Sequence, residues 1–409
     1  MSDWNIARVA DIAAPKGLVG GPFGSSLGSK DYVESGIPVI RGVNLGSDGK
    51  FDMREFVYVT PEKVKQELSR NLAEPGDVVF TQRGTLGQVG IVPDFPYKQY
   101  VISQSQMRLR VNPERAIPEF VYYQFKSPDI MMTIRNHAIT TGVPHINLSI
   151  LSQLKLALPS LSVQENISTI LGVLDDKIAL NGRIANTSLA LAQAKYDEVA
   201  ESASWRSLPM ARTARWLSGG TPSTTEPSYW DGDIPWISAL SLKSPWVADS
   251  ERKVTRLGVE RGTRVVPRDT VIFVVRGSSL DTEFRIGLTQ REVAFGQDCK
   301  ALLAADGIDP VVLFLAIRSH SSEILTLVDH AGHGAGRLST DLITNVQIRL
   351  PDRSLKTEIR SHLRHLVDLG AGRQSENRTL LELRDSLLPR LMSGEIRVRD
   401  AERIVEDAT

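Results

Sequence analysis

The sequence predicts an α+β protein in which two repeat-related globular domains are separated by two long helices. The chain has 409 residues, more than one ordinary hydrophobic core organises, so two or three domains are expected. Its second half repeats the first when residue 158 is set on residue 350. Each copy also ends in a long helical pattern with few helix breakers.

The internal repeat is an ordered series of matching segments. TGVPHINLSILSQLKLALPS (141–160) lies over HGAGRLSTDLITNVQIRLPD (333–352) without a gap, and the same offset sets PGDVVF on PRDTVI. Nearer the N-terminus the offset drifts by a few residues, as loop insertions would cause. The matches there include Arg83 with Arg276, Gln104 with Gln297, and GIPVI with DIPWI. This unbroken order indicates a duplicated chain.

The front part of each copy, residues 1–158 and 201–350, predicts a compact α+β domain. Short β-rich runs such as VVFTQRG, QMRLRV and TVIFVVRG alternate with Gly/Pro turns. One helical run follows in each copy, PEFVYYQFKS in the first and DPVVLFLAIRSH in the second. This mixture of strands and a helix favours an α+β arrangement around one core.

The back part of each copy, residues 159–200 and 351–397, predicts a long helix, with residues 398–409 as a tail. Apolar side chains recur with heptad-like spacing, and the expected packing positions are Ile167, Leu171, Leu174, Ile178, Ile359, Leu363, Leu366, Leu380 and Leu387. Asn181 continues the first seam, where a polar residue typically fixes register. Gly370 and Gly372 predict a kink or break in the second helix. Core packing within each domain is the alternative explanation of both patterns.

The composition excludes several protein classes. No apolar run reaches the length of about 18–20 residues that spans a membrane, and MSDWNIARVA lacks the pattern of a signal peptide. Cys299 is the single cysteine, which excludes an internal disulfide framework and suits a reducing cytoplasm. The formal net charge is zero, so charge alone gives no support to DNA binding through phosphate neutralisation.

No segment of the sequence matches the catalytic or metal-binding motifs that we considered. GPFGSSLGSK (21–30) looks like a phosphate loop, but its glycine spacing and the order Ser29-Lys30 do not match a P-loop. We find no Asp/Asn-Pro-Pro-aromatic methyltransferase motif and no strand-anchored G-x-G-x-x-G. His330 and His333 lie three residues apart, but no second ligand pair follows. We therefore expect no catalytic residue, no metal and no cofactor on this chain.

The repeated phrases resemble the DNA-specificity subunit of type I restriction–modification systems. The first copy carries GPFGSSLGSKDY, GIPVIRGVNL, PGDVVFTQRGTLGQVGIV and TTGVPHINLS; the second carries SGGTPSTTEPSYW, DIPWISALSL and LLPRLMSGEI. The resemblance covers residues from about 18 to about 397. The ordered set, present twice, is far more specific than any single phrase. GPFGSSLGSK thereby resembles the entry to a target-recognition domain.

The resemblance implies a non-catalytic, cytoplasmic subunit that binds double-stranded DNA with a bipartite site. Each globular domain would be a target-recognition domain for one half-site. The two helices would pack as an antiparallel coiled coil, set the half-site spacing and dock DNA methyltransferase subunits, two in number. Restriction/translocase subunits would join through them, with S-adenosylmethionine and ATP only on partners. The alternatives are an enzyme with its own methyltransferase or nuclease activity, and a scaffold that binds proteins.

Candidate DNA-binding residues are polar side chains on loops beside the predicted sheets. They are Arg41, Asn44, Gln82, Arg83, Thr85, Gln88 and His145 in the first domain, and Lys243, Arg276, Ser278, Ser279, Arg285 and Arg337 in the second. Positions that differ between the copies are the better specificity candidates. Arg83 and Arg276 recur, so a structural role in the loop is an equal alternative. The recurrence of Gln104 and Gln297 favours a structural hydrogen-bonding role over base readout. His145 is alternatively a packing residue.

Overall fold

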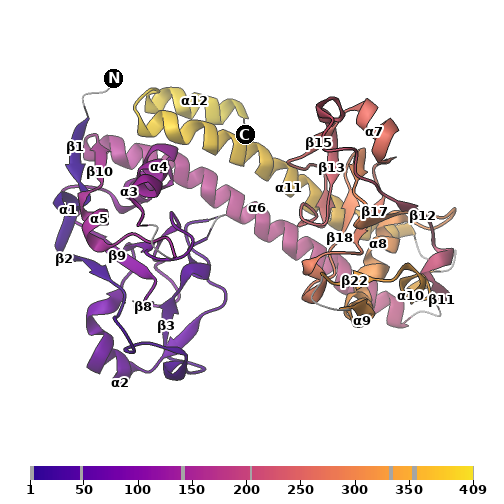
Figure 1. Ribbon diagram of the computed structural model, residues 1–409, viewed down its shortest axis with the longest axis horizontal. Helices are drawn as coiled ribbons and strands as arrows, with labels where there is room; N and C mark the ends of the chain where they lie inside the picture. Colours follow the sequence, from indigo (N-terminus) through magenta and orange to yellow (C-terminus); the bar gives the residue numbers. More distant parts are fainter. Residues whose placement is uncertain are drawn as a thin grey trace. The chain divides into compact units, whose positions relative to one another are not determined.

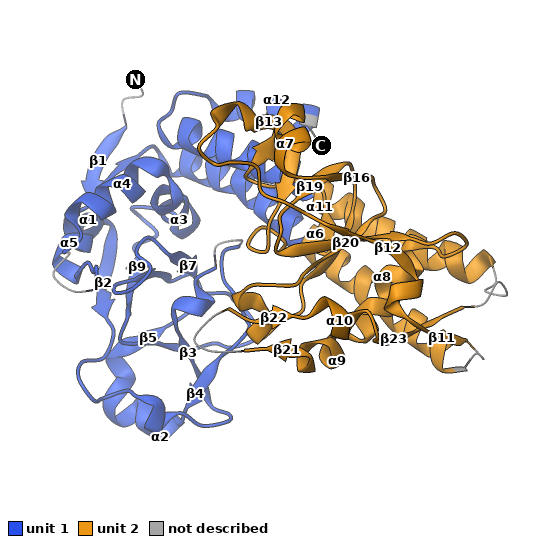
Figure 2. Ribbon diagram, turned by 45° about the vertical axis from the view of Figure 1, so that its right-hand side comes forward, with its two compact units in different colours: residues 1–180, 377–409 blue, residues 181–376 orange. Residues whose placement is uncertain are grey.

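The computed structural model describes residues 4–46, 49–139, 143–202, 205–330, 335–351 and 357–408. The chain divides into two compact units (Figures 1 and 2): unit 1 is residues 1–180 and 377–409, and unit 2 is residues 181–376. The division passes through the two long helices, α6 (Leu161–Ser202) and α11 (Thr357–Met392). Each unit therefore holds one globular part together with a segment of each long helix.

Two four-stranded sheets form the globular part of unit 1. The first has the order β2-β9-β6-β7 and is antiparallel throughout: β2 (Ala13–Gly20), β9 (Gln106–Val111), β6 (Val78–Thr81) and β7 (Val89–Ile91). The second has the order β4-β3-β8-β5, with its central pair parallel: β4 (Val57–Val59), β3 (Ile37–Ile40), β8 (Tyr100–Ile102) and β5 (Leu72–Ala73).

The described residues of unit 1 also contain a short strand pair, six α-helices besides the segments of the long helices, and a few short 3-10 or π-helical turns. The pair is β1 (Asn5–Arg8) with β10 (Lys155–Leu158). The helices are α1 (Val9–Ile12), α2 (Pro61–Lys63), α3 (Pro118–Lys126), α4 (Pro128–His137), α5 (Leu148–Gln153) and α12 (Val398–Ala408). The segment expected as a tail therefore forms a helix, and its Ala401 is buried in the core of unit 1.

The sequence of strand β6 is apolar at successive positions, without the alternation of a strand that has one exposed face. Successive side chains of a strand point to opposite faces. Val78 and Phe80 join the cluster that contains α3, where the Phe80 and Phe125 rings lie 4.5 Å apart. Val79 instead joins the cluster that contains Ile40 and other residues of the second sheet. Both faces of β6 are covered, so every residue of the strand is buried.

Unit 2 repeats this topology, with β14 added as a parallel edge strand of its first sheet. Its first sheet has the order β12-β20-β17-β18-β14: β12 (Ala214–Ser218), β20 (Cys299–Ala304), β17 (Val271–Val274), β18 (Ile286–Thr289) and β14 (Trp246–Val247). The second has the order β15-β13-β19-β16, again with its central pair parallel: β15 (Lys253–Val254), β13 (Trp230–Ile237), β19 (Val293–Phe295) and β16 (Val265–Val266). This agreement confirms the duplication predicted from the sequence.

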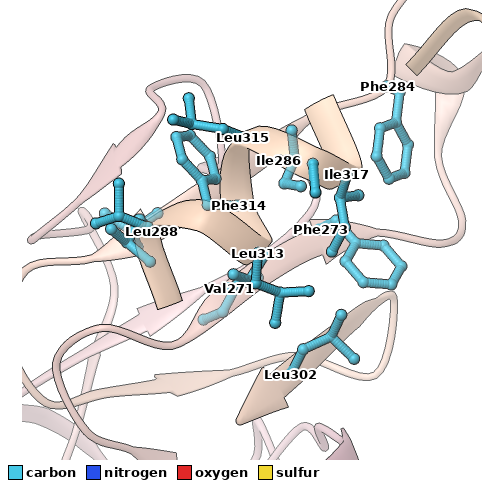
Figure 3. Packing of buried hydrophobic residues seen from close by; sticks show 14 of the residues in the cluster. Val271, Phe273, Phe284, Ile286, Leu288, Leu302, Leu313, Phe314, Leu315 and Ile317 are labelled. Carbon is cyan, nitrogen blue, oxygen red and sulfur yellow. The ribbon is translucent and has the colours of Figure 1, made fainter. Parts of the chain in front are cut away.

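The remaining elements of unit 2 complete the repeat. They are the strand pairs β11 (Arg206–Pro209) with β23 (Gln347–Leu350) and β21 (Val328–Asp329) with β22 (Arg337–Leu338), and the helices α7 (Arg256–Gly262), α8 (Pro310–Ser319), α9 (Ser321–Thr326) and α10 (Thr340–Ile343). Figure 3 shows α8 packed on the first sheet, with Leu313 and Phe314 among the side chains of β17, β18 and β20. The predicted α+β class is confirmed.

The long helices pair within unit 1 along the predicted apolar seam. Ile167, Leu171, Leu174 and Ile178 of α6 share one buried cluster with Leu380 and Leu387 of α11. The pairing is antiparallel, because Ile178 accepts a hydrogen bond from Asn377 (2.9 Å), whereas the earlier Asp175 contacts the later Arg384 (3.0 Å). The same cluster contains Phe120 and other core residues of the globular part. Coiled-coil packing and core packing, the two explanations of the pattern, therefore both apply.

Asp175 joins the globular part of unit 1 to both helices. Its carboxylate accepts hydrogen bonds from the hydroxyl of Tyr123 on α3 (2.7 Å) and from the guanidinium of Arg384 on α11 (3.0 Å). The Asp175 side chain is only 6% exposed, so its charge depends on these partners. Burial, and secondly the Asp175 charge, raise the pKa of Tyr123, which therefore remains a protonated donor.

In unit 2 the buried residues of α6 and α11 join the core of the globular part. Leu363 and Leu366 are buried there, and Ile359 packs against the same cluster while partly exposed. Asn181 is 2% exposed, and its Nδ2 has no hydrogen-bond partner among the described residues. The predicted seam positions are thus largely buried in both units.

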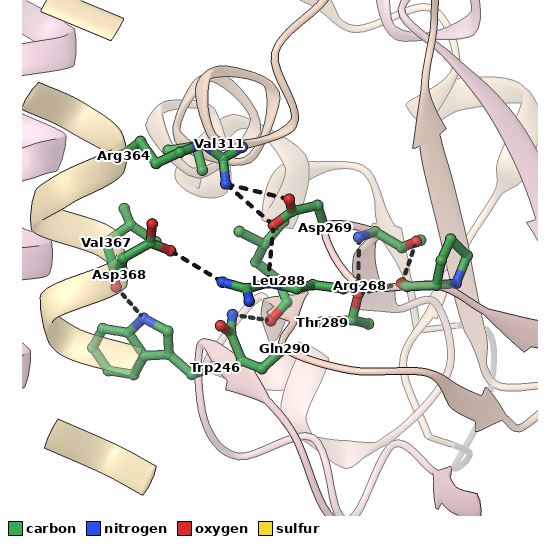
Figure 4. A network of polar contacts seen from close by, with 12 residues as sticks. Trp246, Arg268, Asp269, Leu288, Thr289, Gln290, Val311, Arg364, Val367 and Asp368 are labelled. Atoms are coloured by element: carbon green, nitrogen blue, oxygen red, sulfur yellow. Dashed lines mark hydrogen bonds and ion pairs between the residues drawn. The ribbon is translucent and has the colours of Figure 1, made fainter. Parts of the chain in front are cut away.

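Trp246 docks on α11 at a glycine. Its indole Nε1 donates a hydrogen bond to the backbone oxygen of Val367 (3.0 Å), and the ring is 5% exposed (Figure 4). A β-carbon at Gly370 would lie 2.2 Å from Cζ2 of this ring. The break predicted at Gly370 and Gly372 is wrong, since α11 is a single helix over Thr357–Met392. Tertiary packing compensates the low helix propensity of glycine, and Gly370 is what lets the indole approach.

Two ion pairs beside Trp246 hold the same face of α11. Arg364 donates to the carboxylate of Asp269 (3.2 Å), and Arg268 lies 3.6 Å from Asp368 (Figure 4). All four side chains are about a third to more than half exposed, so each pair contributes little alone. They orient α11 around the buried indole.

The two glycines of α11 are expected to respond oppositely to alanine. Gly370→Ala should destabilise the protein by about 1–3 kcal/mol, because the new methyl group would overlap a buried ring that is hydrogen-bonded in place. Gly372→Ala has no described atom within 4 Å of its β-carbon, so it should stabilise by about 0.5–1 kcal/mol through helix propensity. Urea denaturation of the two variants checks this. Equal effects of the two substitutions would contradict the assigned role of Gly370.

Candidate nucleic-acid interface

Three loops of unit 1 that carry candidate residues lie together. They are residues 41–45 after β3, 82–88 after β6, and 143–147 before α5. The backbones of Arg83 and His145 pair as an isolated antiparallel bridge, and the Ile146 amide donates to the Gln82 carbonyl (3.0 Å). A β-carbon at Gly42 would lie 3.4 Å from Oε1 of Gln88, so the first two loops also touch.

Unit 2 brings together the equivalent loops, 238–243, 276–285 and 335–338. The backbones of Arg276 and Arg337 form the same isolated bridge, and the Leu338 amide donates to the Val275 carbonyl (2.9 Å). Arg285 donates to the Ala239 carbonyl at 3.4 Å, which links the first two loops. The sequence matched Arg83 with Arg276 and His145 with Arg337, and the structure reproduces both matches.

A side-chain cap shapes the first loop of each unit. The Arg41 amide donates to Oδ1 of Asn44 (2.9 Å), and the Ser238 amide donates to Oγ of Ser241 (2.8 Å). Ser241 is therefore the structural equivalent of Asn44, and Lys243 lies two residues beyond it. The signal that sequence reasoning missed is the shared spacing R-x-x-N and S-x-x-S, typical of such a turn.

Asn44 lies inside its loop rather than on its surface. The side chain is fully buried, and Nδ2 donates to the carbonyls of Asp52 (3.1 Å) and Arg54 (2.9 Å). Its amide has no donor left for a base edge. We therefore assign Asn44 a positioning role in place of the predicted base contact.

Several candidates are exposed and free to reach a ligand. They are Arg83, Thr85, Lys243, Arg276, Ser278 and Arg337. The Arg83 guanidinium donates no hydrogen bond to any described residue, which does not fit the alternative of a structural arginine. Arg276 makes one loose ion pair with Asp298 (3.8 Å), in which both side chains are at least 39% exposed.

The remaining candidates are half-buried and partly engaged within the loops. Gln88 accepts from the Thr81 hydroxyl (3.1 Å), Arg285 pairs with Glu283 (3.0 Å), and Arg41 donates to the Glu55 carbonyl. The Ser279 hydroxyl is buried without a partner among the described residues. His145 contacts the Val143 carbonyl through Nδ1 (3.1 Å), and Gln82 engages its neighbours through its backbone.

A wide hollow of about 1430 Å³ lies beside Gln82 and Arg83 in unit 1, and GPFGSSLGSK forms part of its rim. Gln104 holds that segment by donating to the Leu27 carbonyl (2.7 Å), which agrees with its expected structural role. Arg110 binds Asp77 through two bonds of 2.8 Å; this pairing raises the pKa of Arg110. The exposed cations of the lining, Lys16, Arg70 and Arg83, leave the hollow suited to an anionic ligand.

No metal centre appears in the described part of the chain. No group of three or more His, Cys, Asp or Glu side chains is placed to hold an ion there. His330 lies 3.4 Å from Asp281, while His333 falls outside the described residues. Among the helices that the structure describes, none combines the length and apolar character needed to cross a bilayer.

Comparison with known proteins finds similarity to DNA-specificity proteins. Residues 1–187 match the family model described as a type I restriction modification DNA specificity domain. The chain is 22% identical over 428 residues to the type I restriction enzyme MjaIX specificity subunit of Methanocaldococcus jannaschii, covering 97% of this chain and 94% of that protein. Residues 1–187 therefore carry a DNA specificity domain of the type I restriction–modification kind, and the chain as a whole is similar to type I specificity subunits.

Two further comparisons concern part of the sequence and the fold. A stretch of 150 residues is 28% identical to the EcoR124I/EcoR124II specificity subunit of Escherichia coli, which is 36% of this chain and 37% of that protein. The crystal structure of a type I restriction–modification S subunit from M. genitalium superposes with a TM-score of 0.61 at 16% identity. That match covers 95% of this chain and 96% of the other, so the specificity-subunit fold extends over both units.

Asn44 and Thr85 form a matched test of the loop assignments. Asn44→Ala should lower the free energy of unfolding by about 2–3 kcal/mol, because three hydrogen bonds are lost and their backbone partners stay buried. Thr85→Ala, on the exposed neighbouring loop, should change it by less than about 0.5 kcal/mol. Urea denaturation followed by circular dichroism measures both. A stable Asn44→Ala variant would return this residue to the set of base-reading candidates.

Proposed function

We propose that this chain is the sequence-specific DNA-binding subunit of a type I restriction–modification complex, in which each unit reads one half of a bipartite site. One observation carries the proposal. The two units present equivalent triplets of loops, fixed by the same backbone hydrogen bonds, with different exposed side chains. Such a pair of scaffolds suits two DNA segments of different sequence.

The candidate residues divide into two roles. Arg83 and Arg276 occupy equivalent positions and carry the same charge, so they suit contacts to phosphate, which position a protein without reading sequence. The residues that differ between the loops suit contacts to base edges: Arg41, Gln82, Thr85 and Gln88 in unit 1, and Lys243, Ser278, Ser279 and Arg285 in unit 2. His145 lies opposite Arg83 and Arg337 lies opposite Arg276, and both suit further contacts to DNA phosphates.

Partner subunits complete the function. DNA methyltransferase subunits, two in number, would dock on the long helices, and restriction/translocase subunits would join through them. Exposed aliphatic side chains suit this docking: Val173 and Leu180 lie seven residues apart on one face of α6 in unit 1, and Leu191 is exposed in unit 2. The methyltransferases would also share the phosphate contacts, which explains how a chain of zero net charge holds DNA.

The chain itself would carry out no reaction. S-adenosylmethionine and ATP would bind only to partner subunits, and the complex would act in the cytoplasm, where it meets host DNA. The lengths of α6 and α11 would set the separation of the half-sites, because a helix rises by a fixed increment per residue.

The test is a methylome by long-read sequencing, with and without this gene in a host that retains the partner genes. We expect N6-methyladenine to disappear from one split motif, with a few bases on each side of a fixed gap. Complementation by the wild-type gene should restore it. A purified complex that binds random DNA as tightly as the motif would refute the proposal.

Replacing Arg83 or Arg276 by alanine should weaken DNA binding without changing the motif. Loss of one phosphate contact lowers affinity equally for all sequences and reduces the slope of log K against log salt by about 1. Arg115→Ala and Arg212→Ala are matched controls, because both arginines are exposed at the opposite ends of β9 and β12 from the loops. Fluorescence anisotropy over a salt series separates the outcomes. A changed motif with an unchanged slope would reassign these arginines to base readout.

A further inference from the structure

An exposed aliphatic side chain stands at the same turn in both units. Val43 is 51% exposed and Leu240 is 75% exposed, and each directly precedes the capping residue of its loop, Asn44 or Ser241. Their neighbours Leu45 and Leu242 are buried (1% and 2% exposed), so the turn directs one apolar side chain inward and the other outward. The two positions are equivalent in structure although the residues differ.

These side chains belong to the loops already assigned to DNA. The turn of Val43 touches the loop of Gln88 through Gly42, and the turn of Leu240 touches the loop of Arg276 and Arg285. A β-carbon at Gly277 would lie 3.4 Å from the side chain of Ala239. Leu240 also lines a hollow of about 450 Å³, together with Ser238, Lys243 and Arg252 and the acidic Asp249 and Glu251. An apolar group therefore shares this hollow with cations, acids and hydroxyl groups in unit 2.

Isolated apolar side chains are common on protein surfaces, so exposure by itself carries no assignment. The repetition does carry one. Two copies that share few identical residues both keep an aliphatic side chain outward at this turn, and in both the turn is fixed by a buried or half-buried cap. A rigid turn holds the side chain in place before any ligand arrives, which lowers the entropy cost of using it in a contact.

Thymine offers the matching chemistry. Its C5-methyl group is the apolar feature that base edges present in the major groove, and aliphatic side chains recognise it by contact. We infer that Val43 and Leu240 each contact a thymine methyl group and thereby specify thymine within their own half-site. This inference rests on the proposed function and names two specificity-determining residues that the polar candidates do not include.

The experiment removes the methyl group alone. The complex of the full chain with its methyltransferase subunits is bound to duplexes carrying the bipartite motif, in which each thymine in turn is replaced by 2′-deoxyuridine. For the wild-type complex we expect about a three- to fivefold loss of affinity at one thymine in each half-site, the size of one buried methyl contact. Leu240→Ala should abolish that loss in one half-site only, and Val43→Ala in the other only.

Leu257→Ala is the matched control, because this leucine of α7 is also exposed (42%) but lies outside the three loops of unit 2. It should keep the wild-type response to deoxyuridine in both half-sites, and circular dichroism should show all three variants folded. The inference is overturned if no thymine responds, or if the response persists in Leu240→Ala and Val43→Ala. It is also overturned if these variants lose methyltransferase assembly instead, which would assign the side chains to a protein partner.

The outcomes also separate this inference from the proposed function. A wild-type complex that selects the bipartite motif yet ignores deoxyuridine would remove only the thymine contacts. A wild-type complex that fails to select any motif would remove the proposed function itself.

Discussion

The attachment of each globular part to the long helices is the constraint on which the rest of the structure depends. In unit 1 the buried carboxylate of Asp175 provides it, because one side chain binds α3 through Tyr123 and α11 through Arg384. A buried charge of this kind contributes little net stability but strongly disfavours any register that leaves it unpaired. The carboxylate thus couples the pairing of α6 with α11 to the position of the globular part of unit 1, which carries the candidate loops.

Unit 2 meets the same constraint with different chemistry. Trp246 packs on Gly370 and donates to the Val367 carbonyl, where unit 1 uses an acid, a phenol and a guanidinium. A hydrogen bond from a tryptophan to a helix carbonyl needs close approach, and the missing β-carbon of the glycine supplies the space. In both copies the globular part is attached to the long helices, but different residues make the attachment.

The loops show the complementary relation between what is kept and what varies. Equivalent backbone bridges join the second and third loops in the two units, Arg83–His145 in unit 1 and Arg276–Arg337 in unit 2. Since backbone geometry does not depend strongly on the side chains that project from it, Thr85 and Ser278 are free to differ. A duplicated scaffold of this kind can present two independent surfaces, which suits a function that requires two unlike half-sites.

The sequence by itself determined the duplication, the α+β class, the two long helices and the segments that carry the candidate loops. These features are local or periodic, so strand alternation, heptad spacing and the order of anchors are sufficient to reveal them. Only the tertiary structure decided which candidates face outward. The side chain of Asn44 donates both its hydrogen bonds to the carbonyls of Asp52 and Arg54. Gly370 makes room for a tryptophan more than a hundred positions away in the chain. Burial is a sum over contacts between distant segments, and no local pattern encodes that sum.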